Sequence, residues 1–235
     1  MLSSNKQAGL VRGSATIEEF DMEENFWHQR WREGAIGFHL GAPNPLLVAH
    51  FDRLQLPRGS RVLLPLCGKT TDFSWLLAAG FSVAGAELSS IAIDALFDEL
   101  GVTPTIERVG ALSRYSAPAI DIFVGNIFDL SAALLGPVDA CYDRAALVAL
   151  PEEMRGSYAT HLQAITGGAL QLLISFEYDQ SRSDGPPFSI DGAEVARLYA
   201  ATCHLENIAT VDVDGGLKGR VPAVERVWLL RQRRK

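Results

Sequence analysis

The stretch VLLPLCGKTTDF, residues 62–73, joins a short apolar run to a helical pattern through a turn. The apolar run predicts a buried strand over 61–64, and the residues after the turn predict a helix over 72–79 that Gly80 ends. Such a turn often holds a nucleotide-like ligand, because the first backbone N–H groups of the helix are free to bind it. The alternative is an ordinary connection between a strand and a helix.

The sequence of this turn argues against two familiar phosphate-binding motifs. A dinucleotide site needs G-x-G-x-x-G so that the backbone can approach a pyrophosphate, and PLCGKT, residues 65–70, contains only Gly68. The pattern G-x-x-x-x-G-K-[ST] fails as well, because Leu63 stands where its first glycine is required. Lys69 alone indicates little, since a lysine in a turn is usually solvated. A ligand held here therefore needs no pyrophosphate.

The same order of strand, turn and helix continues along the chain. We expect further strands over residues 81–87, 105–109, 120–126, 139–142, 169–178, 208–213 and 224–230, and further helices over residues 16–34, 43–56, 89–100, 152–165 and 192–203. Thr16 and Ser89 occupy N-cap positions of two of these helices. Strands that alternate with helices predict an α/β three-layer sandwich, a mostly parallel sheet with helices on both faces.

Composition narrows the domain organisation and the partners. With 235 residues, 48% of them hydrophobic, the chain can form one sizeable core, and we expect a single domain over 16–235 after a disordered tail over 1–15. The formal net charge of -7 argues against nucleic acid, which binds a concentrated positive face. No apolar stretch approaches the ~20 residues that cross a bilayer, so no membrane partner is expected.

The cysteines and histidines suggest neither a metal site nor a disulfide framework. Cys67, Cys141 and Cys203 are widely spaced and match no metal-ligand pattern. They fit a reducing compartment, and we expect a cytoplasmic monomer whose partner is a small molecule. His39 is left open between a packing or surface role and a role in a site.

Polar and small residues gather where the predicted parallel strands end. Ligands of open α/β sheets bind at the carboxyl ends of the strands, which places residues 65–69, Glu87, Asn126, Asp143 and Arg144 around one crevice. Glu87 follows Gly68 by 19 residues and ends the next strand, where an acid accepts hydrogen bonds from ribose hydroxyls. The pattern indicates a nucleoside ligand.

Four motifs in the same order resemble those of thiopurine S-methyltransferases. They are FWHQRWREGAIGFH (26–39), LLPLCGKTTDFSWLLAAGFSVAGAELS (63–89), YDRAALVAL (142–150) and SFEYDQSRSDGPPF (175–188), and the likeness runs from about residue 23 to residue 230. The resemblance implies an S-adenosylmethionine-dependent enzyme with the Rossmann-like class I methyltransferase fold. It further implies a seven-stranded, mostly parallel sheet with one antiparallel strand near the C-terminus and a helical lid at the N-terminus.

The resemblance also assigns residues to the cofactor. Trp27 and Trp31 would lie over its methionine end, where an aromatic face suits a sulfonium cation, and Phe38 would close the pocket. Leu66 would contact the cofactor through its backbone, beside Gly68.

The remaining assignments concern the nucleoside and the reacting centre. By resemblance Glu87 would bind the ribose, and Asn126 and Ile127 would contact the adenine. Arg144 would hold the cofactor's carboxylate or an anionic acceptor, because its planar fork binds carboxylates. Asp143 would either orient Arg144 or a water, as part of the catalytic centre, or cap the next turn.

The function that the resemblance implies is in-line methyl transfer to a small soft nucleophile. The acceptors would be aromatic or heterocyclic thiols such as thiopurines, or selenium and tellurium oxyanions. A thiolate needs no strong general base, and the sequence shows no Ser/His/Asp or Cys/His arrangement. The alternatives are a halide or thiol methyltransferase with the same cofactor site, and a protein that binds the cofactor without catalysis. The segment DGPPF, residues 184–188, would either stiffen a loop over the crevice or form a surface turn.

Overall fold

One twisted sheet forms the centre of the molecule. The computed structural model describes residues 17–37 and 39–233. In this part of the chain nine strands lie in the order β3-β4-β5-β2-β1-β6-β7-β9-β8. Their bounds are β1 Arg61–Pro65, β2 Ser82–Glu87, β3 Thr105–Val109, β4 Leu112–Ala117, β5 Ile120–Val124, β6 Ala140–Arg144, β7 Leu170–Tyr178, β8 Cys203–Asp212 and β9 Ala223–Gln232.

The strand directions confirm a Rossmann-like sheet. Strands β5, β2, β1, β6 and β7 are parallel to their neighbours within this block. Strand β9 is antiparallel to β7 and to β8, as predicted for one strand near the C-terminus. The described residues form nine strands, two more than the seven that the resemblance implies: β3 was expected over 105–109, and it pairs antiparallel with the unpredicted β4, which lies beside β5. β4 was missed because only Leu112 and Tyr115 of its six residues are buried.

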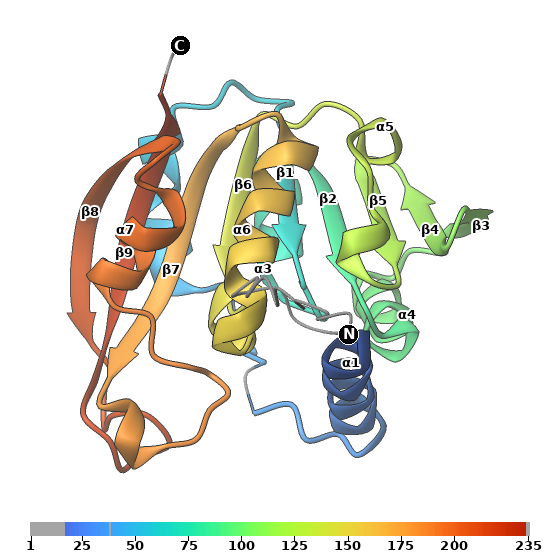
Figure 1. The fold of residues 1–235 in the computed structure, drawn as a ribbon. Helices are drawn as coiled ribbons and strands as arrows, with labels where there is room; N and C mark the ends of the chain where they lie inside the picture. The colour runs from blue at the N-terminus through green and yellow to red at the C-terminus, as the bar shows by residue number, and fades with distance from the viewer. Residues whose placement is uncertain (1–16, 38, 234–235) are drawn as a thin grey trace, which may run out of the picture.

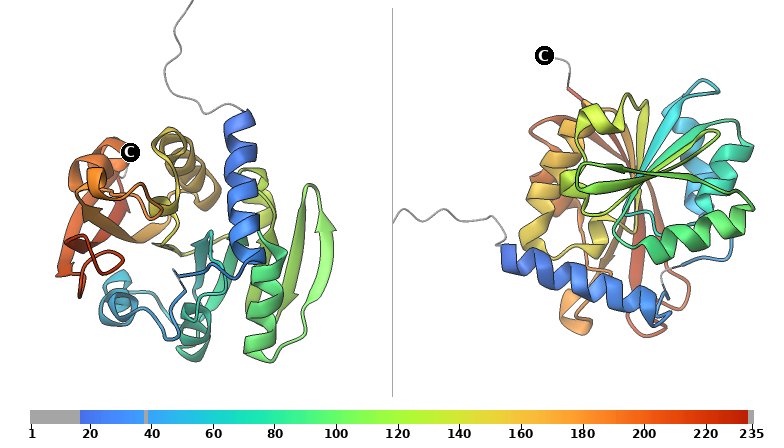
Figure 2. Two further views of the ribbon diagram at one scale, coloured as in Figure 1. Left: turned by 90° about the horizontal axis from the view of Figure 1, so that it is seen from below. Right: turned by 90° about the vertical axis from the view of Figure 1, so that its right-hand side faces the viewer.

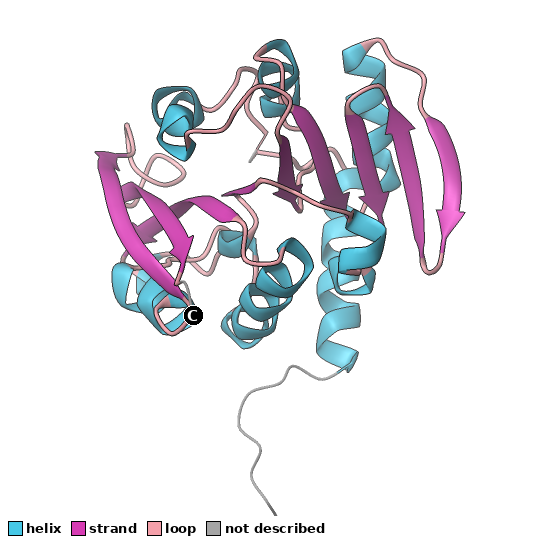
Figure 3. Ribbon diagram, turned by 90° about the horizontal axis from the view of Figure 1, so that it is seen from above, coloured by secondary structure: helices cyan, strands magenta, loops and turns pink. Residues whose placement is uncertain are grey.

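Helices cover both faces of the sheet, as Figure 3 shows. Helices α2, α3 and α4 pack one cluster of apolar side chains against one face, and α5, α6 and α7 pack a second cluster against the other. The α-helices are α1 Ile17–Arg32, α2 Pro45–His50, α3 Asp72–Ala78, α4 Ser90–Leu100, α5 Ala132–Leu135, α6 Glu152–Thr166 and α7 Gly192–Tyr199. Short 3-10 turns are η1 Phe51–Leu54, η2 Ile127–Asp129, η3 Leu147–Ala149 and η4 Gln180–Arg182. The chain therefore has the predicted three layers.

Two predicted helix ends need correction. The last helix ends at Tyr199 instead of residue 203, because Thr202 N turns back to Tyr199 O and Cys203 already pairs with Gln232 in the sheet. Ser89 stands at the N-cap of α4, but its hydroxyl makes no capping hydrogen bond. Its backbone N–H instead donates to Glu87, which ties the helix start to the end of β2. Thr16 lies outside the described residues, and so does the predicted tail over 1–15.

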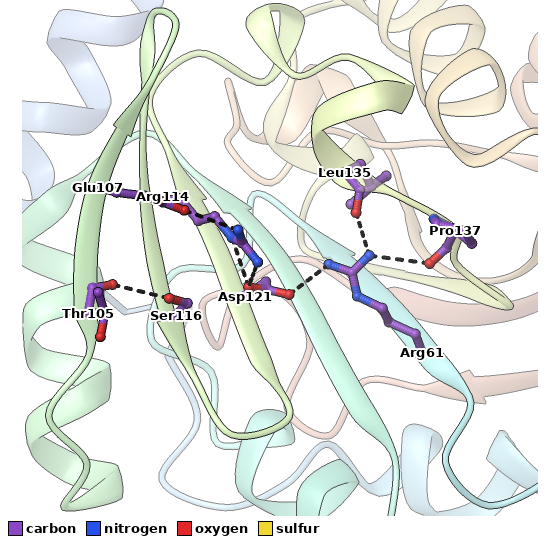
Figure 4. A network of polar contacts seen from close by, with 8 residues as sticks. All are labelled: Arg61, Thr105, Glu107, Arg114, Ser116, Asp121, Leu135 and Pro137. Carbon is purple, nitrogen blue, oxygen red and sulfur yellow. Dashed lines mark hydrogen bonds and ion pairs between the residues drawn. The ribbon is translucent and has the colours of Figure 1, made fainter.

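Ion pairs join the strands at their amino ends (Figure 4). Asp121, at the start of β5, accepts from Arg61 of β1 at 3.1 Å and from Arg114 of β4 at 2.6 Å. Arg61 also donates to the backbone oxygens of Leu135 and Pro137, just before β6. The opposite, carboxyl-terminal edge faces α1 and the loops after β7 (Figures 1 and 2). Among the described helices, none is both long and apolar enough to cross a membrane.

Candidate active site

A cavity of about 480 Å³ opens at the carboxyl ends of the parallel strands. Its walls come from α1, from the segments after β1, β2, β5, β6 and β7, and from the connection between β8 and β9. Residues predicted for the site that line it are Trp27, Trp31, Leu66, Gly68, Glu87, Asn126, Ile127 and Arg144. Phe38, which was predicted to close the pocket, lies outside the described residues. Strand order and topology thus bring most of the predicted residues to one place.

The turn after β1 explains why one glycine is enough. Leu66 and Gly68 both have left-handed backbone angles, with φ of 45° and 52°. The N–H of Gly68 donates to Glu87 Oε2 at 2.7 Å, which fixes the turn to the end of β2. A Cβ atom on Gly68 would lie 3.1 Å from Cζ2 of Trp31, so the tryptophan closes tightly over the turn. The glycine therefore serves a close contact with an aromatic ring and needs no phosphate.

Two further side chains of this turn have surroundings that the sequence did not predict: Lys69 forms an ion pair and Cys67 is buried. The Lys69 ammonium forms an ion pair with Glu99 of α4 at 2.5 Å. Cys67 is buried, and burial followed by the charge of Glu87 raises the pKa of its thiol well above the ordinary value. A protonated thiol is a poor nucleophile, so burial argues against a nucleophilic role for this sulfur.

Glu87 is a buried carboxylate whose oxygens can accept further hydrogen bonds. Its side chain is 6% exposed, and its two oxygens accept from the N–H groups of Gly68 at 2.7 Å and Ser89 at 2.9 Å. Burial raises its pKa, and these hydrogen bonds oppose the rise. Each carboxylate oxygen can accept a second hydrogen bond. The group can therefore receive two hydroxyl donors that approach side by side, as the hydroxyls of a ribose do.

The tryptophans of α1 form the aromatic wall of the cavity. Trp27 and Trp31 stand four residues apart and so lie on one face of the helix. Trp31 is 7% exposed, whereas Trp27 is partly exposed and packs edge-on against Phe26 at 5.1 Å between ring centroids. Glu24 and Arg30, from the same helix, also line the cavity. α1 thus contributes aromatic and charged groups together.

Asn126 and Ile127 follow β5 at the end of the cavity next to Glu87. Oδ1 of Asn126 accepts from Phe128 N at 2.9 Å, and its Nδ2 donates to Glu24 Oε1 at 2.7 Å. Ile127 is buried, and its carbonyl oxygen lies 2.8 Å from Nε2 of His161 on α6. Hydrogen bonds from the Asn126 side chain and from His161 therefore hold the backbone of residues 127–128, which fixes the shape of this part of the cavity.

Arg144 and Asp143 differ in where they point. Arg144 lines the cavity, while Asp143 does not line it and is 0% exposed. The Asp143 carboxylate accepts from Leu147 N at 3.1 Å and from the Tyr158 hydroxyl at 2.8 Å. Burial raises its pKa to about 6 in spite of these bonds. Of the two roles predicted for Asp143, the hydrogen bonds match the cap of the next turn.

The far end of the cavity is apolar and closed by two loops. Pro186 and Pro187, joined by cis peptide bonds, line it together with Leu217 and Lys218 of the β8–β9 connection. The Tyr178 hydroxyl donates to Pro187 O at 2.7 Å, and its ring packs with Leu217. The predicted loop over the crevice at residues 184–188 is thus present. His39 also lines the cavity, and burial, followed by the charges of Lys69 and Arg144, lowers its pKa.

The lining residues that were not predicted include Glu24 and Lys218. Glu24 precedes Trp27 by three residues and so shares its helical face, a spacing that could have identified it. Lys218 lies in a connection whose path follows from packing with Tyr178, for which the sequence gives no local signal.

Comparisons with known proteins identify the family of the chain. A family model described as thiopurine S-methyltransferase (TPMT) matches residues 22–233. The thiopurine S-methyltransferase of Xanthobacter autotrophicus is 57% identical over 210 residues, which cover 89% of this chain and 99% of that protein. The thiopurine S-methyltransferase of Gluconobacter oxydans is 49% identical over 203 residues, covering 86% of this chain and 92% of that protein.

Solved structures share the fold at low identity. The 1,6-didemethyltoxoflavin-N1-methyltransferase of Burkholderia thailandensis, solved with 1,6-didemethyltoxoflavin and S-adenosylhomocysteine, is 16% identical with a TM-score of 0.63. The matched region covers 97% of this chain and 94% of the Burkholderia protein. A TehB-like S-adenosylmethionine-dependent methyltransferase of Corynebacterium glutamicum is 16% identical with a TM-score of 0.54, covering 91% and 100%. By sequence, the chain belongs to the thiopurine S-methyltransferase family.

Proposed function

We propose that this chain transfers the methyl group of S-adenosylmethionine to the sulfur of thiopurines and of other aromatic or heterocyclic thiols. One observation carries the proposal within the family. The acidic Glu87, the aromatic Trp31 and the apolar Pro186 and Pro187 all line one cavity. An adenosyl group and a flat apolar ring can lie in it end to end.

The residues present suit the cofactor. Glu87 has free acceptor positions for the two ribose hydroxyls, and the buried Ile127 offers an apolar surface for the base. Trp27 and Trp31 offer aromatic faces to the sulfonium, a contact worth about 0.5–2 kcal/mol. Arg144 offers a planar fork for the methionine carboxylate or an anionic acceptor. When bound, S-adenosylmethionine supplies an electrophilic methyl group on a positively charged sulfur.

The far end of the cavity positions the acceptor and excludes water. Phe176, Met154 and the two prolines give apolar walls for a ring, and the cationic side chains of Arg144 and Lys218 attract a thiolate. In-line transfer depends chiefly on alignment of sulfur, methyl group and leaving sulfur, so a rigid pocket supplies most of what is needed. A thiol already ionised near neutral pH requires no general base in the pocket.

Oxyanions of selenium and tellurium are a second class of acceptor. The described residues that line the apolar end, from Val148 through Lys218, include no aspartate or glutamate, while Arg144 and Lys218 are cationic. A small anion would therefore meet a favourable potential there. Iodide and bisulfide would distinguish the alternative of a halide or thiol methyltransferase.

Transfer of a labelled methyl group from S-adenosylmethionine tests the proposal directly. Wild-type protein is assayed with 6-mercaptopurine, thiophenol, selenite, tellurite and iodide. We expect the fastest turnover with the aromatic thiols. Binding of the cofactor without transfer to any of these acceptors would support a non-catalytic binding protein instead. A preference for iodide would support the halide enzyme.

The cellular compartment and the oligomeric state of the protein stay predictions. Cys67, Cys141 and Cys203 are free, buried thiols, which supports a reducing compartment such as the cytoplasm. The predicted monomer is tested by sedimentation of the purified chain.

A further inference from the structure

We propose that Glu24 recognises the 6-amino group of the cofactor's adenine, with Asn126 positioning its carboxylate. This inference rests on the proposed use of S-adenosylmethionine and adds a residue to its binding site. It also changes the role expected for the Asn126 side chain, from a contact with the base to support of the residue that makes the contact.

The amide of Asn126 is already engaged at both ends. Its oxygen accepts from Phe128 N at 2.9 Å and so caps the turn η2. Its nitrogen donates to Glu24 Oε1 at 2.7 Å. An exocyclic amino group of a purine is a hydrogen-bond donor and needs an acceptor. The Asn126 oxygen is already shared with Phe128 N, so it has one acceptor position left and is held in place by the cap.

Glu24 offers a charged acceptor beside the amide of Asn126. Its side chain is partly buried and lines the cavity, and its hydrogen bond to Asn126 uses Oε1. Oε2 makes no hydrogen bond with the part of the chain that the structure describes. A carboxylate oxygen accepts from N–H donors more strongly than an amide oxygen does, because it is charged. Glu24 is thus the lining carboxylate that lies against the segment after β5.

The position of Glu24 on α1 agrees with the length of a nucleoside. Glu24, Trp27 and Trp31 are spaced by three and four residues, so they follow one face of the helix. Seven residues of helix span about 10 Å, at about 1.5 Å per residue. Trp31 closes over the turn at Gly68, where the sulfonium end is expected, and Glu24 meets Asn126 after β5. One helical face thus reaches both ends of the adenosyl group.

Binding calorimetry with two ligands tests this assignment. The ligands are S-adenosylhomocysteine and its 6-deamino analogue, which carries a purine without the amino group. For wild type we expect the deamino analogue to bind about tenfold more weakly, because a carboxylate loses a charge-assisted hydrogen bond. For Glu24→Ala the two ligands should bind equally. Glu24→Gln keeps an acceptor and should restore part of the difference. Glu33→Ala removes an exposed carboxylate in the turn just after α1 and should behave as wild type.

The ratio of the two affinities separates recognition from helix packing. If Glu24→Ala weakened both ligands alike and kept the wild-type ratio, Glu24 would only hold α1 in place and the assignment would be wrong. Equal binding of both ligands by wild type would overturn it as well. A wild-type protein that bound neither ligand would contradict the proposed function itself, a separate result.

Discussion

Substitution of Asp143 by asparagine tests how burial sets the pH dependence of stability. The Asp143 carboxylate is 0% exposed, and burial raises its pKa from 3.8 to about 6. In the unfolded chain the group returns to its ordinary pKa. Because the folded protein holds this proton more tightly, the group favours folding at low pH, and that contribution is lost as the pH rises through about 6.

The size of the effect follows from the two pKa values. A tenfold change in proton affinity is worth about 1.4 kcal/mol, so the full loss amounts to about 3 kcal/mol above pH 7. Between about pH 4.5 and pH 7.5 the loss from this group is about 2 kcal/mol, since the unfolded chain is already mostly ionised at the lower pH. The titratable side chains that act on Asp143 from neighbouring elements are Tyr158, Tyr199 and Cys141, whose pKa values are all raised well above their ordinary values. They stay neutral in this range.

Urea unfolding of wild type and Asp143→Asn at these two pH values measures the loss. Asparagine has nearly the same shape and does not titrate, and its oxygen can still accept from Leu147 N. Its Nδ2 replaces an acceptor for Tyr158 and Gln171, a cost that is the same at both pH values and cancels in the comparison. From the lower to the higher pH, the free energy of unfolding of wild type should fall by about 2 kcal/mol more than that of Asp143→Asn. Asp98→Asn, an exposed carboxylate on α4, should follow wild type. If the free energy of unfolding fell by the same amount in wild type and Asp143→Asn, burial of Asp143 would not set this pH dependence.

Three further changes probe the cavity. Gly68→Ala should lower the free energy of unfolding by about 1–2 kcal/mol, because φ is 52° and the methyl group meets Trp31 at 3.1 Å; unchanged thermal unfolding would contradict the close contact. Lys69→Met should change cofactor affinity less than twofold by calorimetry, because its ammonium pairs with Glu99; a tenfold loss would indicate a phosphate-type turn after all. Tyr178→Phe loses the bond to Pro187 and should raise KM for the thiol several-fold at constant cofactor affinity; an unchanged KM would show that this loop does not shape the acceptor site.

Much of the site was predictable because parallel strands end at one edge. Glu87, Asn126 and Arg144 come from different strand ends, and the carboxyl-edge rule alone places them together, as the cavity shows. The Gly68 turn was predictable from the change of a strand pattern into a helical one. The helix over 16–34 was predicted from its spacing, and the family resemblance added the cofactor role of its tryptophans, for which the sequence has no other local signal.

Other features depend on contacts that one sequence does not encode locally. The strand β4 was missed because it is half exposed, and α7 was extended too far because the turn over residues 200–202 contains no glycine or proline. Asp143 was placed near the reacting centre beside Arg144. Side chains alternate along a strand, so adjacent residues at the end of β6 point to opposite faces. That alternation could have separated the two roles before the structure did.

The most direct test of the account is calorimetric titration of the chain with S-adenosylhomocysteine, comparing wild type with Glu87→Ala. The carboxylate of Glu87 is buried at the end of β2 and lines the cavity. We predict binding of one ligand per chain by wild type and at least about tenfold weaker binding by Glu87→Ala, the usual cost of losing hydrogen bonds to a charged group. No binding by wild type, or equal binding by the two proteins, would contradict the central claim that this cavity holds the adenosyl cofactor.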